Sequence, residues 1–286
     1  FASFSTDDIR GYLYALDASY HGPRMHISVS APYVSNLGTP SSFIDGEEET
    51  ISNSVQSYGL LSDSTKKILS TVGADTSSWG SYNAVNEVTL FNYYQDSGSN
   101  DTFNGKFQEF IFFNSDTSND RAAIENDMNN AFNGYSSAKS LGRQKLLNEY
   151  PGADAAYSVR QINSNYSGPI MRVDNGYTEV DIYPLVNGDL DTESIIQHAK
   201  VNTITKDAGV SVWYDQSGNG NDAAQATNAN QPLICDNGVI IYENGKPAVE
   251  FDGSNDVLFT SNTGINVGSQ RNDFAVTTLF RNTFWG

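Results

Sequence analysis

The segment WYDQSGNGNDAAQAT, residues 213–227, runs from two aromatic residues into an acid, an amide, a serine and a series of glycines and asparagines. Three kinds of structure fit this composition: a catalytic loop, a metal-binding loop and a tight corner between β-strands. The residues that lead into it, GVSVWYD (209–215), have the pattern of a strand with one buried face. Glycine and asparagine after such a strand supply the backbone conformations that a turn requires. The segment therefore predicts a strand followed by a sharp corner.

Strand-like segments of this kind dominate the chain. They are rich in aromatic or β-branched residues, most of them alternate, and they end at turn signals such as Asn244-Gly245 and Asp252-Gly253. Many short strands with closely spaced turns indicate an all-β fold, a β-sandwich or jelly roll. The expected strands are residues 11–18, 24–31, 86–94, 105–114, 209–215, 238–245, 247–253 and 273–282.

Few helices are expected, and these are peripheral. Residues 117–132 carry Ile124, Met128 and Phe132 at a spacing of four, which predicts a helix with one apolar stripe. Thr117 and Asp120 resemble a capping box at its start. Residues 137–149 and a short segment that starts at Asp191 are the other candidates. The strand pattern further predicts a core that contains Phe107, Phe110, Phe112, Trp213, Val249, Phe251 and Phe274.

Charge and composition narrow the classes of partner. The chain of 286 residues has a formal net charge of -18, which argues against binding to nucleic acid or to an anionic membrane surface. No apolar run approaches the ~18 residues that span a bilayer. Cys235 is the only cysteine, so no internal disulfide is expected. A surface rich in hydroxyls and amides is typical of extracellular or virion β-proteins, and a start at Phe1 without a signal peptide predicts a processed or excised piece.

Four stretches carry a resemblance to a known fold. They are AAYSVRQINSNYSGPIMRV (155–173), VSVWYDQSGNGNDAAQATNANQP (210–232), NGKPAVEFDGSND (244–256) and FNGKFQEFIFFNSDTSNDRAAIENDMNNAF (103–132). The first three resemble the N-terminal half of a concanavalin-A-like (laminin-G-like) jelly roll, and the fourth resembles its C-terminal end. Such modules occur in phage and bacterial surface proteins and in the glycoside hydrolase family 54 arabinofuranosidases. The resemblance covers about half of the chain well.

The two halves stand in permuted order. Residues 1–135 resemble the C-terminal half of the jelly roll, 136–152 form a helical linker, and 153–286 resemble the N-terminal half. Either the chain is a circular permutant or it is one period of a tandem array. We favour one sandwich per 286 residues, and therefore expect Phe1 and Gly286 to lie close together.

The resemblance to the arabinofuranosidases implies a catalytic acid in a glycine-rich loop before the last strand. Asp96 in YYQDSGSNDTF is the nearest match. A retaining glycosidase also needs a second carboxyl group ~5–5.5 Å away, and no segment matches the nucleophile strand of those enzymes. Glu47, Glu48 and Glu49 form an acidic run that we expect in a solvated loop. We therefore expect no carboxylate partner for Asp96, although Asp17 or Asp101 facing it would restore the enzyme hypothesis.

Calcium binding is the alternative for the opening segment. Asp215, Ser217 and Asn219 match the first, third and fifth positions of a calcium loop, but Ala226 stands where a bidentate acid should be. The favoured interpretation is a structural corner, in which Asp215 and Asn219 bond to backbone amides and Trp213 and Tyr214 lie on opposite faces of the strand. No metal or other cofactor is required. His21, His26 and His198 lack a third partner at zinc spacing.

Two functions from different classes remain. The first is a non-catalytic structural or adhesive module of a virion or cell surface, with a glycan or neighbouring structural subunits as partner, self-association included. Its candidate ligand-binding residues are Tyr214, Asp215, Asn219 and Asn221. The second is a glycoside hydrolase of the arabinofuranosidase type. Arg160 and Arg172 are expected to pair with acids, with a sugar or carboxylate ligand as the alternative.

Overall fold

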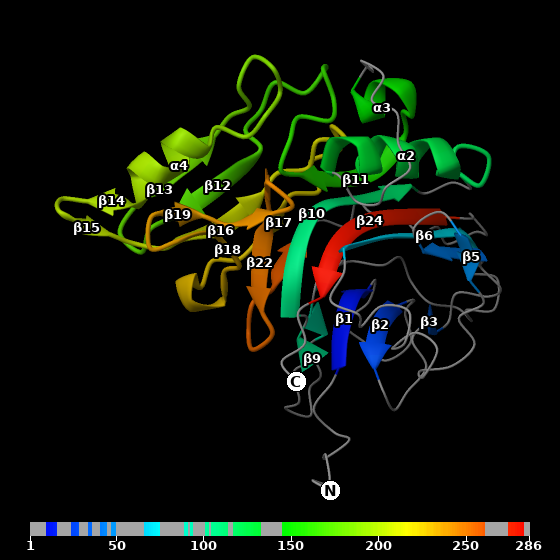
Figure 1. The fold of residues 1–286 in the computed structure, drawn as a ribbon, viewed down its shortest axis with the longest axis horizontal. Coiled ribbons are helices and arrows are strands. Elements are labelled where there is room, and N and C mark those ends of the chain that lie inside the picture. Colours follow the sequence, from blue (N-terminus) through cyan, green and yellow to red (C-terminus); the bar gives the residue numbers. More distant parts are fainter. Residues whose placement is uncertain are drawn as a thin grey trace, which may run out of the picture.

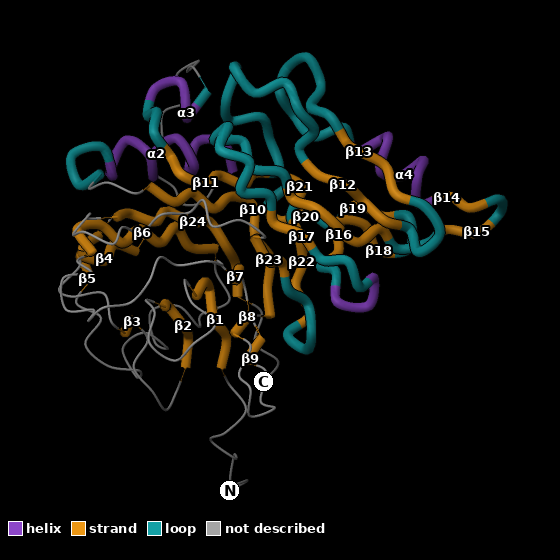
Figure 2. The backbone as a smooth tube through the Cα atoms, turned by 180° about the vertical axis from the view of Figure 1, so that it is seen from behind, coloured by secondary structure: helices purple, strands orange, loops and turns teal. Residues whose placement is uncertain are grey.

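Antiparallel strands make up most of the described structure, and helices are few (Figures 1 and 2), so the chain is all-β. The computed structural model describes residues 10–15, 24–28, 34–35, 41–44, 47–49, 66–74, 89–90, 92–93, 101–102, 104–113, 117–132, 145–260 and 274–282. In these residues no helix is both long enough and apolar enough to cross a membrane.

Strand β10 (Asn104–Phe113) lies at the centre of the sheet. Strand β24 (Phe274–Asn282) pairs with one of its edges over nearly its whole length. The opposite edge is shared, because β22 (Val249–Asp252) pairs with residues 104–107 and β11 (Ala153–Ser158) with residues 109–113. Segments far apart in the sequence thus meet on one strand. Beyond β24 the sheet continues through β6 (Lys66–Ala74), β4 (Ser41–Ile44) and β5 (Glu47–Glu49).

From β22 the sheet also extends in the other direction. The next strands are β18 (Leu233–Asp236), β16 (Ala208–Trp213), β12 (Met171–Asp174) and β13 (Glu179–Ile182), as Figure 1 shows. A branch leaves β16 through β17 (Ala223–Ala224), β23 (Leu258–Thr260), β7 (Thr89–Leu90), β1 (Arg10–Ala15), β2 (Arg24–Ser28) and β3 (Val34–Ser35). Shorter pairs are β18 with β19 (Val239–Ile240), β8 (Asn92–Tyr93) with β9 (Asp101–Thr102), β14 (Lys200–Val201) with β15 (Ile204–Thr205), and β20 (Tyr242–Glu243) with β21 (Lys246–Pro247).

The predicted core is confirmed where side chains are described. Six of the expected residues are no more than 1% exposed: Phe107, Phe110, Phe112, Trp213, Val249 and Phe251. The Phe107 ring meets Phe251 edge to face, with centroids 5.9 Å apart, and stacks on Phe280 at 5.5 Å. The side chain of Phe274 lies outside the described residues.

The helices follow the predicted pattern with shorter bounds. Helix α2 (Arg121–Phe132) buries Ile124, Met128 and Phe132, as expected, and it packs beside β6 and β24. It begins at Arg121 because residues 118–120 form a turn, in which the Thr117 carbonyl accepts the N–H groups of Asp120 and Arg121. The Thr117 hydroxyl meets no partner among the described residues, so the predicted side-chain cap is not formed.

The other two helices are short. Helix α3 (Leu146–Glu149) is the last turn of the expected segment 137–149, of which 137–144 lie outside the described residues. Helix α4 (Thr192–Ala199) starts as predicted, with Asp191 Oδ1 accepting the N–H of Ser194 at 3.1 Å. A 3-10 turn, η1, covers Asn228–Asn230.

Three local predictions were wrong. The expected strand 86–94 is two short strands, β7 and β8, which pair with different neighbours. The expected strand 238–245 is likewise divided into β19 and β20, because the chain leaves β18 to form a separate hairpin. Glu47–Glu49, expected in a loop, form β5 against β4. The Asn244-Gly245 turn is confirmed, with φ angles of 48° and 75°.

Strands from both predicted halves pair with one another. β10 lies before residue 135, and its partners β11, β22 and β24 all come after residue 152. β6 and β7 pair in the same way with β24 and β23. The division into halves and the permuted jelly roll stay predictions. Phe1 and Gly286 lie outside the described residues, so the expectation that they lie close together stays a prediction.

Candidate functional site

The opening segment forms a corner that is built around Asp215. This carboxylate is 1% exposed and lies two residues after Trp213, the last residue of β16. Its Oδ1 accepts the N–H groups of Ala156 and Ser217, at 2.9 and 2.8 Å. Its Oδ2 accepts the Ser217 hydroxyl at 2.7 Å and the N–H of Asn221 at 3.0 Å. The predicted hydrogen bonds from Asp215 to backbone amides are therefore present.

The same corner covers the edge of β11 that faces away from β10. Ser217 Oγ, Asn219 Nδ2 and Asn221 Nδ2 all donate to the carbonyl of Asp154, at 3.1, 3.1 and 2.8 Å. Asn219 thus bonds to backbone carbonyls and not, as expected, to amides. Because a bare strand edge invites pairing with other chains, these side chains stand in for a missing neighbouring strand.

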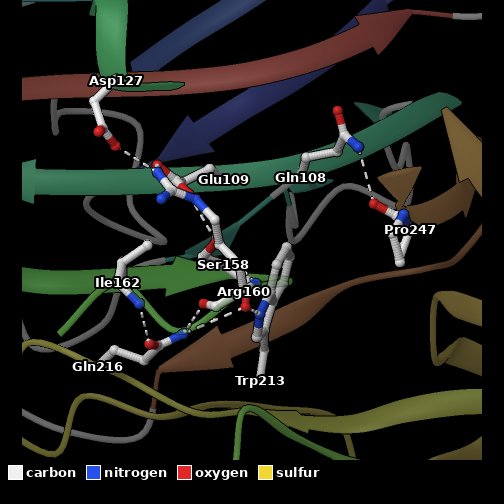
Figure 3. Close-up of polar contacts among 9 residues, drawn as sticks. All are labelled: Gln108, Glu109, Asp127, Ser158, Arg160, Ile162, Trp213, Gln216 and Pro247. Atoms are coloured by element: carbon white, nitrogen blue, oxygen red, sulfur yellow. Dashed lines mark hydrogen bonds and ion pairs between the residues drawn. The ribbon is translucent and has the colours of Figure 1, made fainter. Parts of the chain in front are cut away.

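Gln216 extends this cover beyond β11. It is fully buried; its Oε1 accepts the N–H of Ile162 at 2.9 Å, and its Nε2 donates to the carbonyl of Arg160 at 2.9 Å (Figure 3). The Trp213 indole donates to the carbonyl of Ser158 at 3.1 Å in the same region. Sequence reasoning missed Gln216, because nothing in the sequence shows that an amide beside the glycine turn is buried.

A buried ion cluster connects α2 with β10 and β11. Arg160 lies between Glu109 and Asp127, with Nε 3.1 Å from Glu109 Oε2 and Nη2 2.6 Å from Asp127 Oδ2 (Figure 3). Ser158 Oγ also donates to Glu109 at 2.7 Å. Burial raises the pKa of Glu109, while the Arg160 guanidinium and the Ser158 hydroxyl act to lower it. The prediction that Arg160 pairs with acids is confirmed, and the cluster holds the helix on the sheet.

Arg172 forms the second predicted pair. Its Nε and Nη2 lie 2.7 and 3.0 Å from the two oxygens of Asp181, on the neighbouring strand β13. The Tyr214 hydroxyl donates to Asp181 Oδ1 at 2.9 Å, and the hydrogen bond from Arg172 lowers the pKa of Asp181. Tyr214, a candidate ligand-binding residue, therefore belongs to this half-exposed ion pair.

The metal and catalytic candidates are placed as follows. Both oxygens of Asp215 already accept hydrogen bonds from the chain, and no group of three or more His, Cys, Asp or Glu side chains in the described part is arranged to hold a metal ion. His198 Nε2 lies 2.8 Å from the carbonyl of Thr178. Three of the remaining candidates lie outside the described residues, namely Asp17, His21 and Asp96. For the other two, His26 and Asp101, the structure describes the backbone alone.

A cleft of about 690 Å³ lies elsewhere, across four adjacent strands. Its floor follows one row of paired residues, in which Asp174 on β12 pairs with Gly209 on β16. Gly209 pairs with Leu233 on β18, and Leu233 pairs with Glu250 on β22. Directly paired residues of antiparallel strands project from the same face. The cleft is therefore a surface of the sheet, bordered by the loops at 175–177, 228–231 and 252–256.

Acidic side chains dominate the lining of this cleft. Among the described residues it contains five acids and one cation, namely Asp174, Asp207, Glu250, Asp252, Asp256 and Lys206. Tyr177 is 68% exposed at the rim, and Lys206 Nζ lies 5.5 Å from the centre of its ring. Amide side chains of Asn175, Asn228 and Gln231 complete the wall. The lining thus combines an exposed ring, amides and carboxylates.

Asp256 is the most perturbed of these acids. It is 5% exposed, and its Oδ2 accepts the N–H of Asp252 at 2.9 Å. Burial, with Asp252 and Glu250 nearby, raises its pKa to about 7, although the bond from Asp252 N–H acts in the opposite direction. An acid of this kind in a cleft can hold or release a proton near neutral pH.

None of the ligand-binding residues predicted from the sequence lines the cleft. Tyr214, Asp215, Asn219 and Asn221 belong to the corner and to the Arg172 ion pair. From the sequence, the segment DGSND (252–256) is interpreted as a turn and as part of the resemblance but not as a ligand site, although it places two acids of the cleft four residues apart. Comparison of the chain with protein-family models, with curated proteins and with solved structures finds no match.

Proposed function

We propose that the protein is a non-catalytic glycan-binding module, displayed on a virion or on a bacterial cell surface. The observation that carries the proposal is the cleft, which joins an exposed tyrosine to amide and carboxylate groups on one face of the sheet. Sugars offer hydroxyls to such groups and an apolar ring face to an aromatic side chain. The volume of about 690 Å³ lies within the range of small-ligand sites.

The wider setting is part of the same proposal. We assign the sheet to a concanavalin-A-like jelly roll on the sequence resemblance, with the antiparallel strands as support. On this assignment the partners are a glycan and neighbouring structural subunits, with self-association included, and the location is extracellular.

A glycan array followed by titration tests the proposal. Tyr177→Ala removes the ring at the rim and should weaken binding of any array hit by roughly fivefold, since stacking contributes of the order of 1 kcal/mol. Tyr183→Ala is the matched control, because Tyr183 is also exposed, at 53%, but does not line the cleft. Equal effects of the two substitutions, or an array without hits, would count against glycan binding in the cleft.

One observation favours a second function, a glycoside hydrolase of the arabinofuranosidase type. Asp256, with its pKa of about 7, lies in the cleft near Glu250 and Asp252, and a glycosidase acid must keep its proton near neutral pH. Hydrolysis of aryl arabinofuranosides by the unmodified protein, abolished by Asp256→Asn, would replace the binding function by this one. Retained glycan binding without turnover supports the module.

A further inference from the structure

We propose that the ligand of the cleft is a cationic glycan, an oligosaccharide that carries free amino groups on its rings. The inference rests on the proposed glycan-binding function and names the class of sugar. It starts from the imbalance of charge in the lining, where the described acids outnumber the cations five to one. Lys106 lies beside only one of these acids, with its Nζ 3.4 Å from Glu250 Oε1. A sulfated or carboxylated glycan would meet like charges there, whereas an ammonium group would meet opposite ones.

Asp256 supplies an independent observation. Its side chain lies in the wall of the cleft at 5% exposure, and its Oδ2 accepts the N–H of Asp252. No donor among the described residues reaches its Oδ1. This oxygen is not among the buried atoms without a partner, so it is open to solvent, and an ammonium group from a ligand would supply it with both a hydrogen bond and a compensating charge.

The same ammonium group would change the protonation of Asp256. A nearby positive charge favours the ionised carboxylate and lowers its pKa from the value of about 7 found in the free protein. Binding of an amino sugar should therefore release protons from Asp256 near pH 7. A neutral sugar gives no such release from this group.

A basic peptide carries the same charge but fits the cleft less well. Peptides commonly bind by adding a strand to an open sheet edge. The four floor strands have no such edge, since β12 lies between β13 and β16, β18 lies between β16 and β22, and β22 pairs with β10. The exposed Tyr177 ring and the amides of Asn228 and Gln231 instead suit a ring that bears hydroxyl groups.

Calorimetric titration with three oligosaccharides of equal length tests the inference. The first consists of 2-amino sugars, the second is its N-acetylated counterpart, and the third consists of neutral sugars without nitrogen. We expect the amino oligosaccharide to bind roughly tenfold tighter than the acetylated one, about 1.4 kcal/mol. Proton release should appear as a binding enthalpy that varies with the ionisation enthalpy of the buffer. Asp256→Asn should abolish this advantage, so that the amino and the acetylated oligomer bind with similar affinity, while the amide oxygen can still accept the N–H of Asp252 and keep the loop in place.

The controls separate the possible failures. Glu193→Gln makes the same change of charge at an exposed residue of α4 and should leave all three affinities unchanged. Asp252→Asn is a second cleft variant, to be used if Asp256→Asn does not fold. Equal or tighter binding of the acetylated or neutral oligomer would overturn the preference for amino sugars while glycan binding stands. Failure of all three to bind would remove the proposed function itself, and tighter binding of a lysine peptide that depends on Asp256 would replace the sugar by a peptide.

Discussion

Gln231 packs so closely against Gly209 that no side chain larger than hydrogen fits at position 209. A Cβ atom on Gly209 would lie 2.6 Å from Oε1 of Gln231 and 2.9 Å from its Cβ. Gln231 itself is 3% exposed, and its Nε2 donates to the carbonyl of Gln225 at 2.9 Å. The glycine in β16 thus allows an amide to lie against the floor of the cleft.

Gly209→Ala should displace Gln231, weaken glycan binding and cost roughly 1–3 kcal/mol of unfolding free energy, because overpacking forces neighbours out of their positions. Urea denaturation and the titration above measure the two effects. In the background of Gln231→Gly the same substitution should cost clearly less, since both clashing atoms of Gln231, Oε1 and Cβ, are gone. A cost that is the same in both backgrounds would mean that the clash does not determine the effect.

Asp256 should make stability depend on pH. Its pKa is about 7 in the folded protein and close to 3.8 when unfolded, so the folded state binds the proton more tightly. The stabilisation that protonated Asp256 gives the folded state is fully present below the unfolded pKa and is lost as the pH rises through 7. The loss in unfolding free energy amounts to about 1.4 kcal/mol for each pKa unit between the folded and the unfolded state. Asp256→Asn should therefore gain stability relative to the unmodified protein between pH 5 and pH 8, as measured by urea denaturation. A difference that does not change with pH, once Glu193→Gln has corrected for net charge, would argue against a buried acid.

Removal of one partner from the buried ion cluster should be costly. Glu109→Gln leaves Arg160 with Asp127 alone in a site where Glu109 is fully buried, and we expect a loss of about 3 kcal/mol. Asp181→Asn breaks the Arg172 pair, whose side chains are 37% and 30% exposed, and should cost no more than about 1 kcal/mol. Thermal unfolding of both variants compares them, and a larger loss for Asp181→Asn would contradict this assignment.

Phe251→Ala should cost roughly 3–5 kcal/mol, because the ring is fully buried between β10 and its neighbours and packs on Phe107. Val239→Ala serves as the control, since Val239 is 67% exposed. Denaturant unfolding measures both losses. A loss below about 1 kcal/mol for Phe251→Ala would place β22 at the periphery of the core.

Calcium should not stabilise the corner at Asp215. Both of its oxygens accept donors from Ala156, Ser217 and Asn221, so a cation would have to displace existing hydrogen bonds. The melting temperature should be the same in millimolar calcium and in a chelator. A calcium-dependent rise that Asp215→Asn removes would revive the metal loop.

The sequence predicts the strands best where alternation and turn chemistry agree. The bounds of β10, β16, β22 and β24 and the buried aromatic residues follow from a period of two, and Asn244-Gly245 from the positive φ angles of a tight turn. Prediction fails where tertiary pairing decides, as in residues 86–94, whose two short strands have different partners.

The cleft could not be predicted, because it forms only when four strands pair. Asp174 and Glu250 are 76 positions apart in the sequence and come to lie in one row on the same face of the sheet, with Gly209 and Leu233 between them. Nor does composition distinguish the buried Asp256 from the exposed Asp252, since both lie in the same polar segment. Their difference arises from packing.

The shared edge of β10 has a consequence for how the chain folds. The partners of this strand begin at residues 153, 249 and 274, so most of its hydrogen bonds join segments far apart in the sequence. A nascent chain released from the ribosome only to residue 200 would present β10 with β24 and β22 still missing, and its apolar face uncovered. Folding should accordingly be slow, in the range of milliseconds to seconds found for topologies with many nonlocal contacts, and most prone to aggregation before β24 is made.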